Sequence, residues 1–222
     1  MTKAVKVLKL DFLTVKPYCR FLFVLLAVGF LFGIGNKEPY IIPPMFMIWA
    51  LFLASYPFSI GEKNSLDKLY GTFSLKRKDI VTGRYMFSLA GSVLFLAVSV
   101  VIVFLSAVII EKNIEIEELL FVVCIGFLIF SVVASFQVPI FFKFGYNKAK
   151  LLTYLPLLAI AFIVPLANLI PADSAIGRIF NEIGKIIEEK TYLAYVMMLS
   201  ISFIVLYISY IISRSIYEKR DI

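Results

Sequence analysis

The chain has 222 residues, of which 61% are hydrophobic and only 17% are charged, and it contains 22 Lys+Arg, 15 Asp+Glu and no His. A soluble domain is nearer half apolar and a quarter charged, so this composition excludes an ordinary soluble globular protein. Without His, and with two Cys far apart in the sequence, a zinc or haem site built on His is excluded as well.

Residues 1–17 precede the first long apolar run and are predicted to form an amphipathic elbow helix. On a helical wheel its apolar residues share one face: Ala4, Val5, Val7, Leu8, Phe12 and Val15. The opposite face carries Lys3, Lys6, Lys9 and Lys16. A basic amphipathic helix of this kind lies among lipid headgroups and is attracted by anionic lipids. It is either a plain membrane-surface anchor or an elbow that also transmits movement from a partner.

Six segments of about 18 to 26 residues contain no charged residue apart from Arg20, and each is long enough to cross the ~30 Å hydrocarbon layer. They are residues 18–35, 41–60, 85–110, 119–142, 151–170 and 192–213. A membrane barrel would instead show alternating strands of about ten residues. The predicted fold class is therefore an all-α integral membrane protein, with six transmembrane helices in a single domain over residues 1–222.

Small and polar residues stand out within these apolar segments. Gly29 and Gly33 form a GxxxG motif, which lets two helices approach closely. The motif marks either a dimer or subunit interface or close packing inside one protomer. Gln137 and Asn168 are the most polar side chains in the spans, and we expect them to donate hydrogen bonds between helices rather than to bind substrate.

The connection at residues 61–84, between the second and third spans, is much longer than the about six residues that suffice to join neighbouring helices. Gly71 is predicted to separate a short helix over residues 66–70 from a second helix, which is capped by Ser74, starts at Leu75 and runs into the third span. The loop presents apolar and aromatic side chains among charges: Leu66, Leu69, Tyr70 and Phe73. This pattern is typical of a protein-binding knob, although burial in the headgroups is an alternative.

Residues 171–191, between the fifth and sixth spans, are predicted to form a second amphipathic helix. Apolar side chains recur at helical spacing with charges between them: Ile176, Ile179, Phe180, Ile183, Ile186 and Ile187. The helix would lie on the outer surface, either packed against the rim of the bundle or acting as a lid over an exit path.

The basic residues are distributed unevenly between the two sides of the membrane. Of the 22 Lys+Arg, 17 fall before the first span, between spans two and three, between spans four and five, and after span six, and 5 fall in the other three loops. Short cytoplasmic loops carry such an excess, so both termini are predicted to be cytoplasmic.

Several kinds of chemistry are missing from the sequence. No charged side chain lies in the middle of a span, as ion-coupled transport and proton relays usually require. No GxxxxGK[ST] phosphate loop is present, so the chain is not expected to bind ATP in that way. These features predict a protein that is not an enzyme. Two classes remain: the membrane half of a pump driven by another subunit, or a passive binding or immunity protein.

The stretch DKLYGTFSLKRKDIVTGRY, residues 67–85, resembles the loop between spans two and three of bacterial ABC-2 type transporter permeases. In the small six-span branch this loop has an aromatic residue, then Leu-Pro-Ile-Ser-Arg, then Ile-Val and a basic-aromatic pair. The corresponding residues here are Phe73, Ser74, Leu75, Lys76, Arg77, Ile80, Val81, Arg84 and Tyr85. Ser74 replaces the proline of the pattern. Within the branch, the chain is similar to the permeases that export phenol-soluble modulins and other peptides, which have the fold of type V exporters.

The resemblance implies a partner and a mechanism. In such transporters two permeases, identical or different, pair with two cytoplasmic ATPase subunits in the bacterial cell membrane. ATP and Mg²⁺ bind to the ATPase, and the permease itself holds no cofactor. The short loop helix acts as a coupling helix that sits in a groove of the ATPase. By this resemblance, the inserted residues are Leu66, Asp67, Leu69 and Tyr70, supported by Phe73, Lys76 and Arg77.

Only the composition of the spans gives information about the cargo. With 22 Phe in the chain and few polar groups in the spans, a transport path would suit an amphipathic or hydrophobic molecule better than a sugar or an ion. Export of an amphipathic peptide is the favoured hypothesis, with lipid or hydrophobic-drug efflux as the alternative. Membrane lipids are expected contacts, and no nucleic-acid partner is expected. The rival class remains a membrane protein that binds a toxin or another subunit without pumping.

Overall fold

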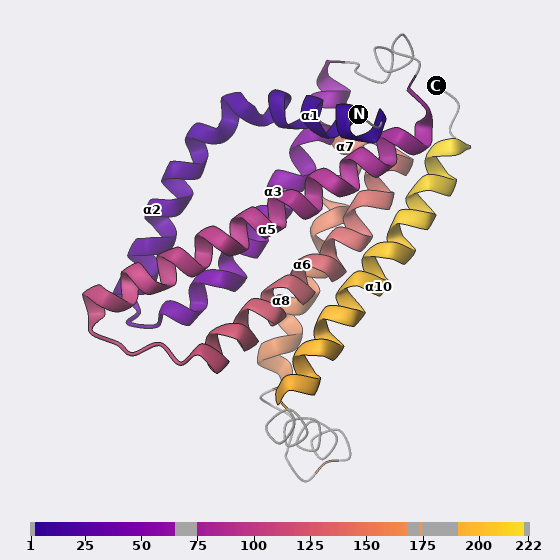
Figure 1. Ribbon diagram of the computed structural model, residues 1–222. Coiled ribbons are helices and arrows are strands. Elements are labelled where there is room, and N and C mark those ends of the chain that lie inside the picture. The colour runs from indigo at the N-terminus through magenta and orange to yellow at the C-terminus, as the bar shows by residue number, and fades with distance from the viewer. Residues whose placement is uncertain (1–2, 65–74, 168–173, 175–190, 220–222) are drawn as a thin grey trace.

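The computed structural model describes residues 3–64, 75–167, 174 and 191–219, and nearly all of these residues are helical (Figure 1). The longer helices are α1 (Lys3–Val15), α2 (Arg20–Gly35), α3 (Ile42–Lys63), α5 (Arg77–Ile110), α6 (Ile116–Phe144), α8 (Leu155–Ala167) and α10 (Thr191–Glu218). Short helical turns are η1 (Lys16–Cys19), η2 (Pro39–Ile41), α7 (Tyr146–Ala149) and η3 (Leu152–Tyr154). The prediction of an all-α membrane protein is confirmed.

Within the described residues, 4 helices are long and apolar enough to cross a membrane: α3 together with η2, α5, α6 and α10. These helices contain the predicted spans 41–60, 85–110, 119–142 and 192–213. The other two predicted spans, 18–35 and 151–170, correspond to the shorter apolar helices α2 and α8 with η3. Six complete crossings therefore remain a prediction. The predicted outer helix at residues 171–191 falls almost wholly outside the described residues.

Helix α5 extends well beyond the hydrocarbon layer. Its 34 residues span about 50 Å, compared with ~30 Å of hydrocarbon. The helix begins at Arg77 rather than at the predicted Leu75, because Lys76 still has an extended backbone (ψ 145°). The backbone carbonyl of Lys76 accepts hydrogen bonds from the amides of Asp79 and Ile80, which start the first turn.

Two apolar clusters hold the helices together. The larger cluster joins α3, α5 and α6 around side chains such as Phe46, Leu51 and Phe130, which are fully buried. The smaller cluster lies at the end of the bundle next to α1 and includes Val7, Val81 and Tyr217. Lipid tails are as apolar as these side chains, so tight packing and hydrogen bonds between helices must supply the specificity of association.

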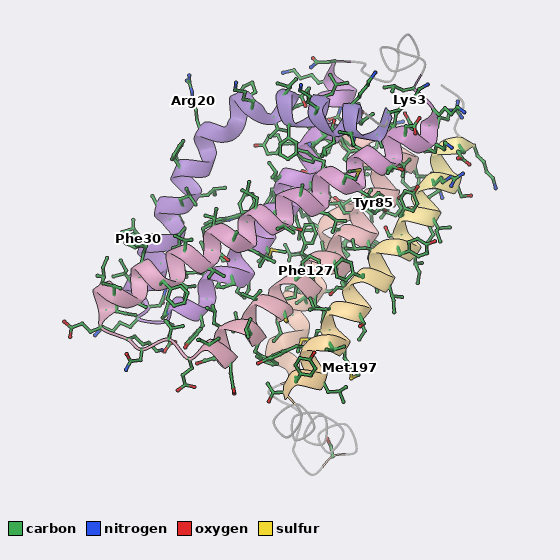
Figure 2. All side chains as sticks on the ribbon, viewed as in Figure 1. Lys3, Arg20, Phe30, Tyr85, Phe127 and Met197 are labelled. Atoms are coloured by element: carbon green, nitrogen blue, oxygen red, sulfur yellow. The ribbon has the colours of Figure 1, made fainter. Side chains whose placement is uncertain are left out.

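Hydrogen bonds made by buried hydroxyl groups link α5, α6 and α10. Tyr85 lies on the side of α5 that faces α10 (Figure 2), and its hydroxyl is 2.6 Å from the hydroxyl of Ser209 and 2.9 Å from that of Ser213. Ser209 in turn donates to the backbone carbonyl of Ser135 in α6, at 2.7 Å. Three helices therefore share one buried network.

The GxxxG residues of α2 contact α3 of the same chain. A Cβ atom added at Gly29 would lie 2.5 Å from Cε2 of Phe46, and one added at Gly33 would lie 2.7 Å from Cδ1 of Ile42. Both glycines allow α2 to approach α3 closely over its second half. From this contact α2 runs away from the bundle towards α1, which lies across the end of α5, so that α1, α2 and α5 enclose a triangle (Figure 1).

Candidate functional site at the N-terminal end of α5

Of the seven residues predicted to couple the chain to an ATPase, five lie outside the described residues and two lie just after them. Leu66, Asp67, Leu69, Tyr70 and Phe73 lie outside the described residues. Lys76 and Arg77 are described, and they form the start of α5. The candidate site therefore consists of the two helices that flank the loop, α3 and α5, and of the elements that contact them.

Arg77 connects the start of α5 with the end of α10. One terminal nitrogen of its guanidinium donates to the backbone carbonyl of Glu218, at 2.6 Å, and lies 3.4 Å from that of Tyr217. The last carbonyls of a helix lack partners within the helix and carry a partial negative charge, so a cation is favourable there. A residue predicted to support the coupling helix thus also anchors the C-terminal end of α10.

A buried ion pair connects α1 with α5. Nη1 of Arg84 is 3.3 Å from Oδ1 of Asp11, and the two side chains are 5% and 1% exposed. The guanidinium of Arg84 also lies over the ring of Phe58 in α3, 4.8 Å from its centroid. Removing one member of a buried pair leaves the other charge uncompensated, which typically costs about 3–5 kcal/mol. The pair therefore ties α1 and α3 to the first turns of α5.

Close backbone packing brings these two charges together. A Cβ atom added at Gly83 would lie 2.6 Å from Cβ of Val7 and 3.0 Å from the carbonyl oxygen of Ala4. Only glycine permits this approach of α1 to α5. The buried stripe of α1 consists of Ala4, Val7, Asp11 and Val15. The expected apolar face, by contrast, is partly exposed, because Phe12 is 42% exposed although its ring packs against Phe87.

Burial changes the acidity of Asp11. Loss of solvation raises the pKa of its carboxyl from 3.8 to about 6, and the positive charge of Arg84 opposes this rise only in part. Its Oδ2 atom has no hydrogen-bond partner within the part of the chain that the structure describes. Because the folded pKa is the higher one, this carboxyl contributes stability below about pH 4 that is lost as the pH rises through about 6.

Glu62 fixes the other end of the loop. Its carboxylate, at the end of α3, accepts hydrogen bonds from the backbone amides of Tyr146 and Asn147, at 2.6 and 3.0 Å, and from the side-chain amide of Asn147, at 3.1 Å. A carboxylate is favourable at exposed amides of this kind. Gly145, with φ of 79°, makes the sharp turn that presents these amides to Glu62.

A cavity of about 220 Å³ lies among these groups. Its walls come from α3, α5, α6, α7 and α10, and they combine aromatic side chains with the polar groups of Glu62, Arg84 and Lys148. Glu62 and Arg84 therefore border a common space at this end of the bundle, and Tyr217, whose carbonyl lies next to Arg77, lines it as well. We call this group of contacts, Asp11–Arg84, Glu62 with residues 145–147, and Arg77 with the end of α10, the base network.

Sequence reasoning did not identify most of this network. Arg84 is part of the loop motif, but the motif did not indicate that its side chain is buried. Asp11 was assigned no role. It was detectable as the only acid in the predicted elbow helix, one turn after Val7 and one before Val15 on the same stripe. Gln137, which we expected to donate a hydrogen bond between helices, is fully buried, and Asn168 lies outside the described residues.

Comparison with known proteins identifies the family. The family model described as "ABC-2 family transporter protein" matches residues 6–218, which run from α1 to the end of α10 and include the whole base network. The search of curated proteins and the search of solved structures each return no match. Since the model covers nearly the entire chain, the protein belongs to the ABC-2 family and is a membrane-embedded, multi-pass permease of an ABC transporter.

Proposed function

We propose that the chain is the permease subunit of an ATP-driven exporter, which moves an amphipathic or hydrophobic cargo, with a cytotoxic or antimicrobial-type peptide as the favoured candidate, out of the cell. A separate cytoplasmic ATPase binds ATP and Mg²⁺ and supplies the energy. The observation that carries the proposal, beyond membership of the family, is that both ends of the predicted coupling loop are anchored in the base network.

The base network supports a route by which a movement of the loop reaches the membrane helices. The end of α3 is bound through Glu62 to the connection that precedes α8. The start of α5 is bound through Arg77 to α10 and through Arg84 to α1. A displacement of residues 65–74 is therefore applied to several helices at once. An ATPase shifts the permease between states only through contacts that differ between those states, and these residues are where we propose that it makes them.

The proposed orientation places the base network in the cytoplasm. Both ends of the described chain, near Lys3 and Glu218, lie at the same end of the bundle (Figure 1). The excess of Lys and Arg in the loops on that side favours a cytoplasmic location for both termini. The partner ATPase would then reach residues 65–74 directly from the cytosol.

The apolar surface of the spans supports the choice of cargo. Large hydrophobic side chains are exposed along α2, α8 and α10, for example Phe23 (74%), Phe162 (68%) and Tyr207 (64%). A path formed between two copies of such surfaces would offer few fixed partners to a polar solute. Efflux of a lipid or a hydrophobic drug is the second candidate, supported by the same surfaces. A second permease copy, identical or different, completes the proposed transporter.

Co-purification tests the proposal at its first step. Tagged permease and the ATPase encoded beside it are co-expressed and extracted in detergent, with Tyr70→Glu compared with the wild type. We expect the ATPase to be retained by the wild type and lost with Tyr70→Glu. Tyr192→Glu is the matched control, because Tyr192 is 80% exposed at the start of α10, the end opposite to the base network.

The outcomes separate the pump from the passive class. Failure of the wild type to retain an ATPase under any nucleotide condition favours a passive binding or immunity protein. Equal loss with Tyr70→Glu and Tyr192→Glu indicates general damage rather than a coupling surface. Once the ATPase is retained, uptake of a labelled amphipathic peptide into inverted vesicles, compared with uptake of a hydrophobic dye, discriminates the two cargo classes.

A further inference from the structure

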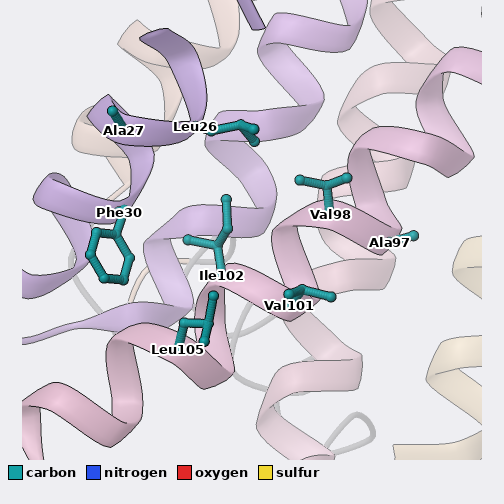
Figure 3. Close-up of a pocket in the computed structure, with 8 residues that line it drawn as sticks. All are labelled: Leu26, Ala27, Phe30, Ala97, Val98, Val101, Ile102 and Leu105. Atoms are coloured by element: carbon teal, nitrogen blue, oxygen red, sulfur yellow. The ribbon is translucent and has the colours of Figure 1, made fainter. Parts of the chain in front are cut away.

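A wide apolar groove separates α2 from α5 on the outside of the bundle (Figure 3). Its volume is about 570 Å³. One wall is formed by Leu26, Ala27 and Phe30 of α2, and the other by five residues of α5 between Ala97 and Leu105. Every residue in both walls is apolar, in contrast to the cavity of the base network.

The groove results from the way in which α2 is attached. Gly29 and Gly33 hold the second half of α2 against α3, whereas its first half diverges from α5 towards α1 (Figure 1). At the other corner of the triangle, α1 is fixed to α5 by Gly83 and by the Asp11–Arg84 pair. The space between α2 and α5 is therefore kept open by two separate attachments.

The length of the groove suits part of a hydrocarbon chain. The wall on α5, from residue 97 to residue 105, is about 12 Å long at 1.5 Å per residue. Both walls present only apolar side chains over this length, so an acyl chain can lie along it.

Positive charge lies at the end of the groove nearest to α1. Arg20 begins α2, two turns before Ala27 and on the same stripe of the helix, so it lies about 10 Å from the groove along the axis. Its side chain is exposed and points away from the bundle (Figure 2), and Lys16 in the preceding turn is exposed as well. Apolar walls that lead to exposed cations match a lipid with an anionic headgroup.

We propose that this groove is a binding site for one anionic phospholipid from the leaflet that contains α1, with an acyl chain between α2 and α5 and the phosphate beside Arg20. The lipid fills the space that the divergence of α2 leaves open and thereby supports the position of α2. This inference depends on the membrane location of the chain and not on the proposed cargo or direction of transport.

Native mass spectrometry of the full-length chain tests the site. Protein is reconstituted into nanodiscs of phosphatidylglycerol and phosphatidylcholine in equal amounts, and the lipid retained after release is counted. We expect one retained phospholipid, mainly phosphatidylglycerol. Ala97→Trp places a large ring in the groove and should lower retention about tenfold. Arg20→Gln should lower the preference for phosphatidylglycerol about fivefold while lipid remains bound.

Matched variants and a second measurement separate the outcomes. Ala161→Trp is the control, because Ala161 is exposed on α8 outside the groove and should retain lipid like the wild type. Ala27→Trp fills the groove from the opposite wall if Ala97→Trp does not fold. A photoactivatable phosphatidylglycerol should label wild-type peptides of α2 and α5. Equal retention in the wild type and both groove variants overturns the proposal, as does a dimer that these variants abolish, since the groove would then serve a second copy.

Discussion

The ion pairs near the two ends of α5 differ in their exposure to solvent. Near its start, Asp11 and Arg84 are 1% and 5% exposed and connect two helices through the protein interior. Just beyond its other end, Lys112 and Glu38 approach to 2.7 Å, but they are 35% and 53% exposed. Water screens the second pair almost completely, whereas the first has lost its solvation. The start of α5 is therefore tied to α1 by a desolvated pair, whereas the ion pair at the opposite end adds little to the packing there.

Breaking the buried pair should have the largest effect. Arg84→Leu leaves the carboxyl of Asp11 buried without its cation, and we expect a loss of about 3–5 kcal/mol in the free energy of unfolding. The measurement is unfolding in mixed micelles. The double variant Asp11→Leu with Arg84→Leu should recover most of the loss, because apolar replacement of a whole pair is often neutral. A double variant as unstable as Arg84→Leu would show that the charges themselves are needed.

A change of pH should also affect the contact between α1 and α5, because the carboxyl of Asp11 titrates. The pKa of Asp11 is raised to about 6, so docking of α1 should weaken as the pH rises from about 4 to about 6 and change little above that. Each unit of this shift corresponds to about 1.4 kcal/mol. Infrared spectroscopy should detect a protonated carboxyl that titrates near pH 6 and is absent from Asp11→Asn. A titration near pH 4 would contradict the burial of this group.

Adding a side chain at Gly83, where α1 and α5 are in close contact, should have an effect of intermediate size on stability. The added atoms in Gly83→Val would collide with Val7, which lies 2.6 Å from the position of a Cβ atom, and overpacking of this kind costs about 1–3 kcal/mol. Proteolysis at residues 1–17 should become faster, and Val7→Ala in the same chain should partly restore protection. Gly35→Val is the control, because nothing lies within 4 Å of a Cβ at Gly35. Equal effects at both glycines would argue against docking through Gly83.

Neutralising Glu62 should have a smaller effect on stability and a specific effect on coupling. Glu62→Gln weakens charge-assisted hydrogen bonds to the amides of residues 146 and 147, which are worth about 1.5–3 kcal/mol when intact and less at an exposed site. We expect the retained ATPase to hydrolyse ATP with reduced dependence on cargo. Glu38→Gln, in the exposed pair with Lys112 at the opposite end of the bundle, should leave that dependence unchanged.

Breaking the exposed pair should have the smallest effect. Lys112→Ala should leave the free energy of unfolding close to that of the wild type, and addition of salt should remove any remaining difference. A loss as large as that of Arg84→Leu would contradict the distinction between the two ends of α5.

Much of the fold follows from the distribution of charge in the sequence, because four uncharged runs correspond to four long helices. For α2 and α8 the described residues do not reach the length of a full crossing, so these two spans stay a prediction. Arg77 was identified through the loop motif, but its contact with α10 depends on the tertiary fold. Asp11 was not identified because periodicity assigns the apolar face of an amphipathic helix to lipid. Here the buried stripe of α1 packs on protein instead. It includes Asp11, whose carboxylate pairs with Arg84 of α5.

The attachment of α2 to α3 also provides an optical reporter. Trp49 is the only tryptophan of the chain, and its ring lies 4.8 Å from that of Phe46, the side chain that Gly29 contacts. When α2 moves away from α3, the surroundings of this ring pair become more open, and the emission of Trp49 should shift accordingly. Intrinsic fluorescence can therefore follow this helix during a transport cycle in real time, in an otherwise unlabelled protein.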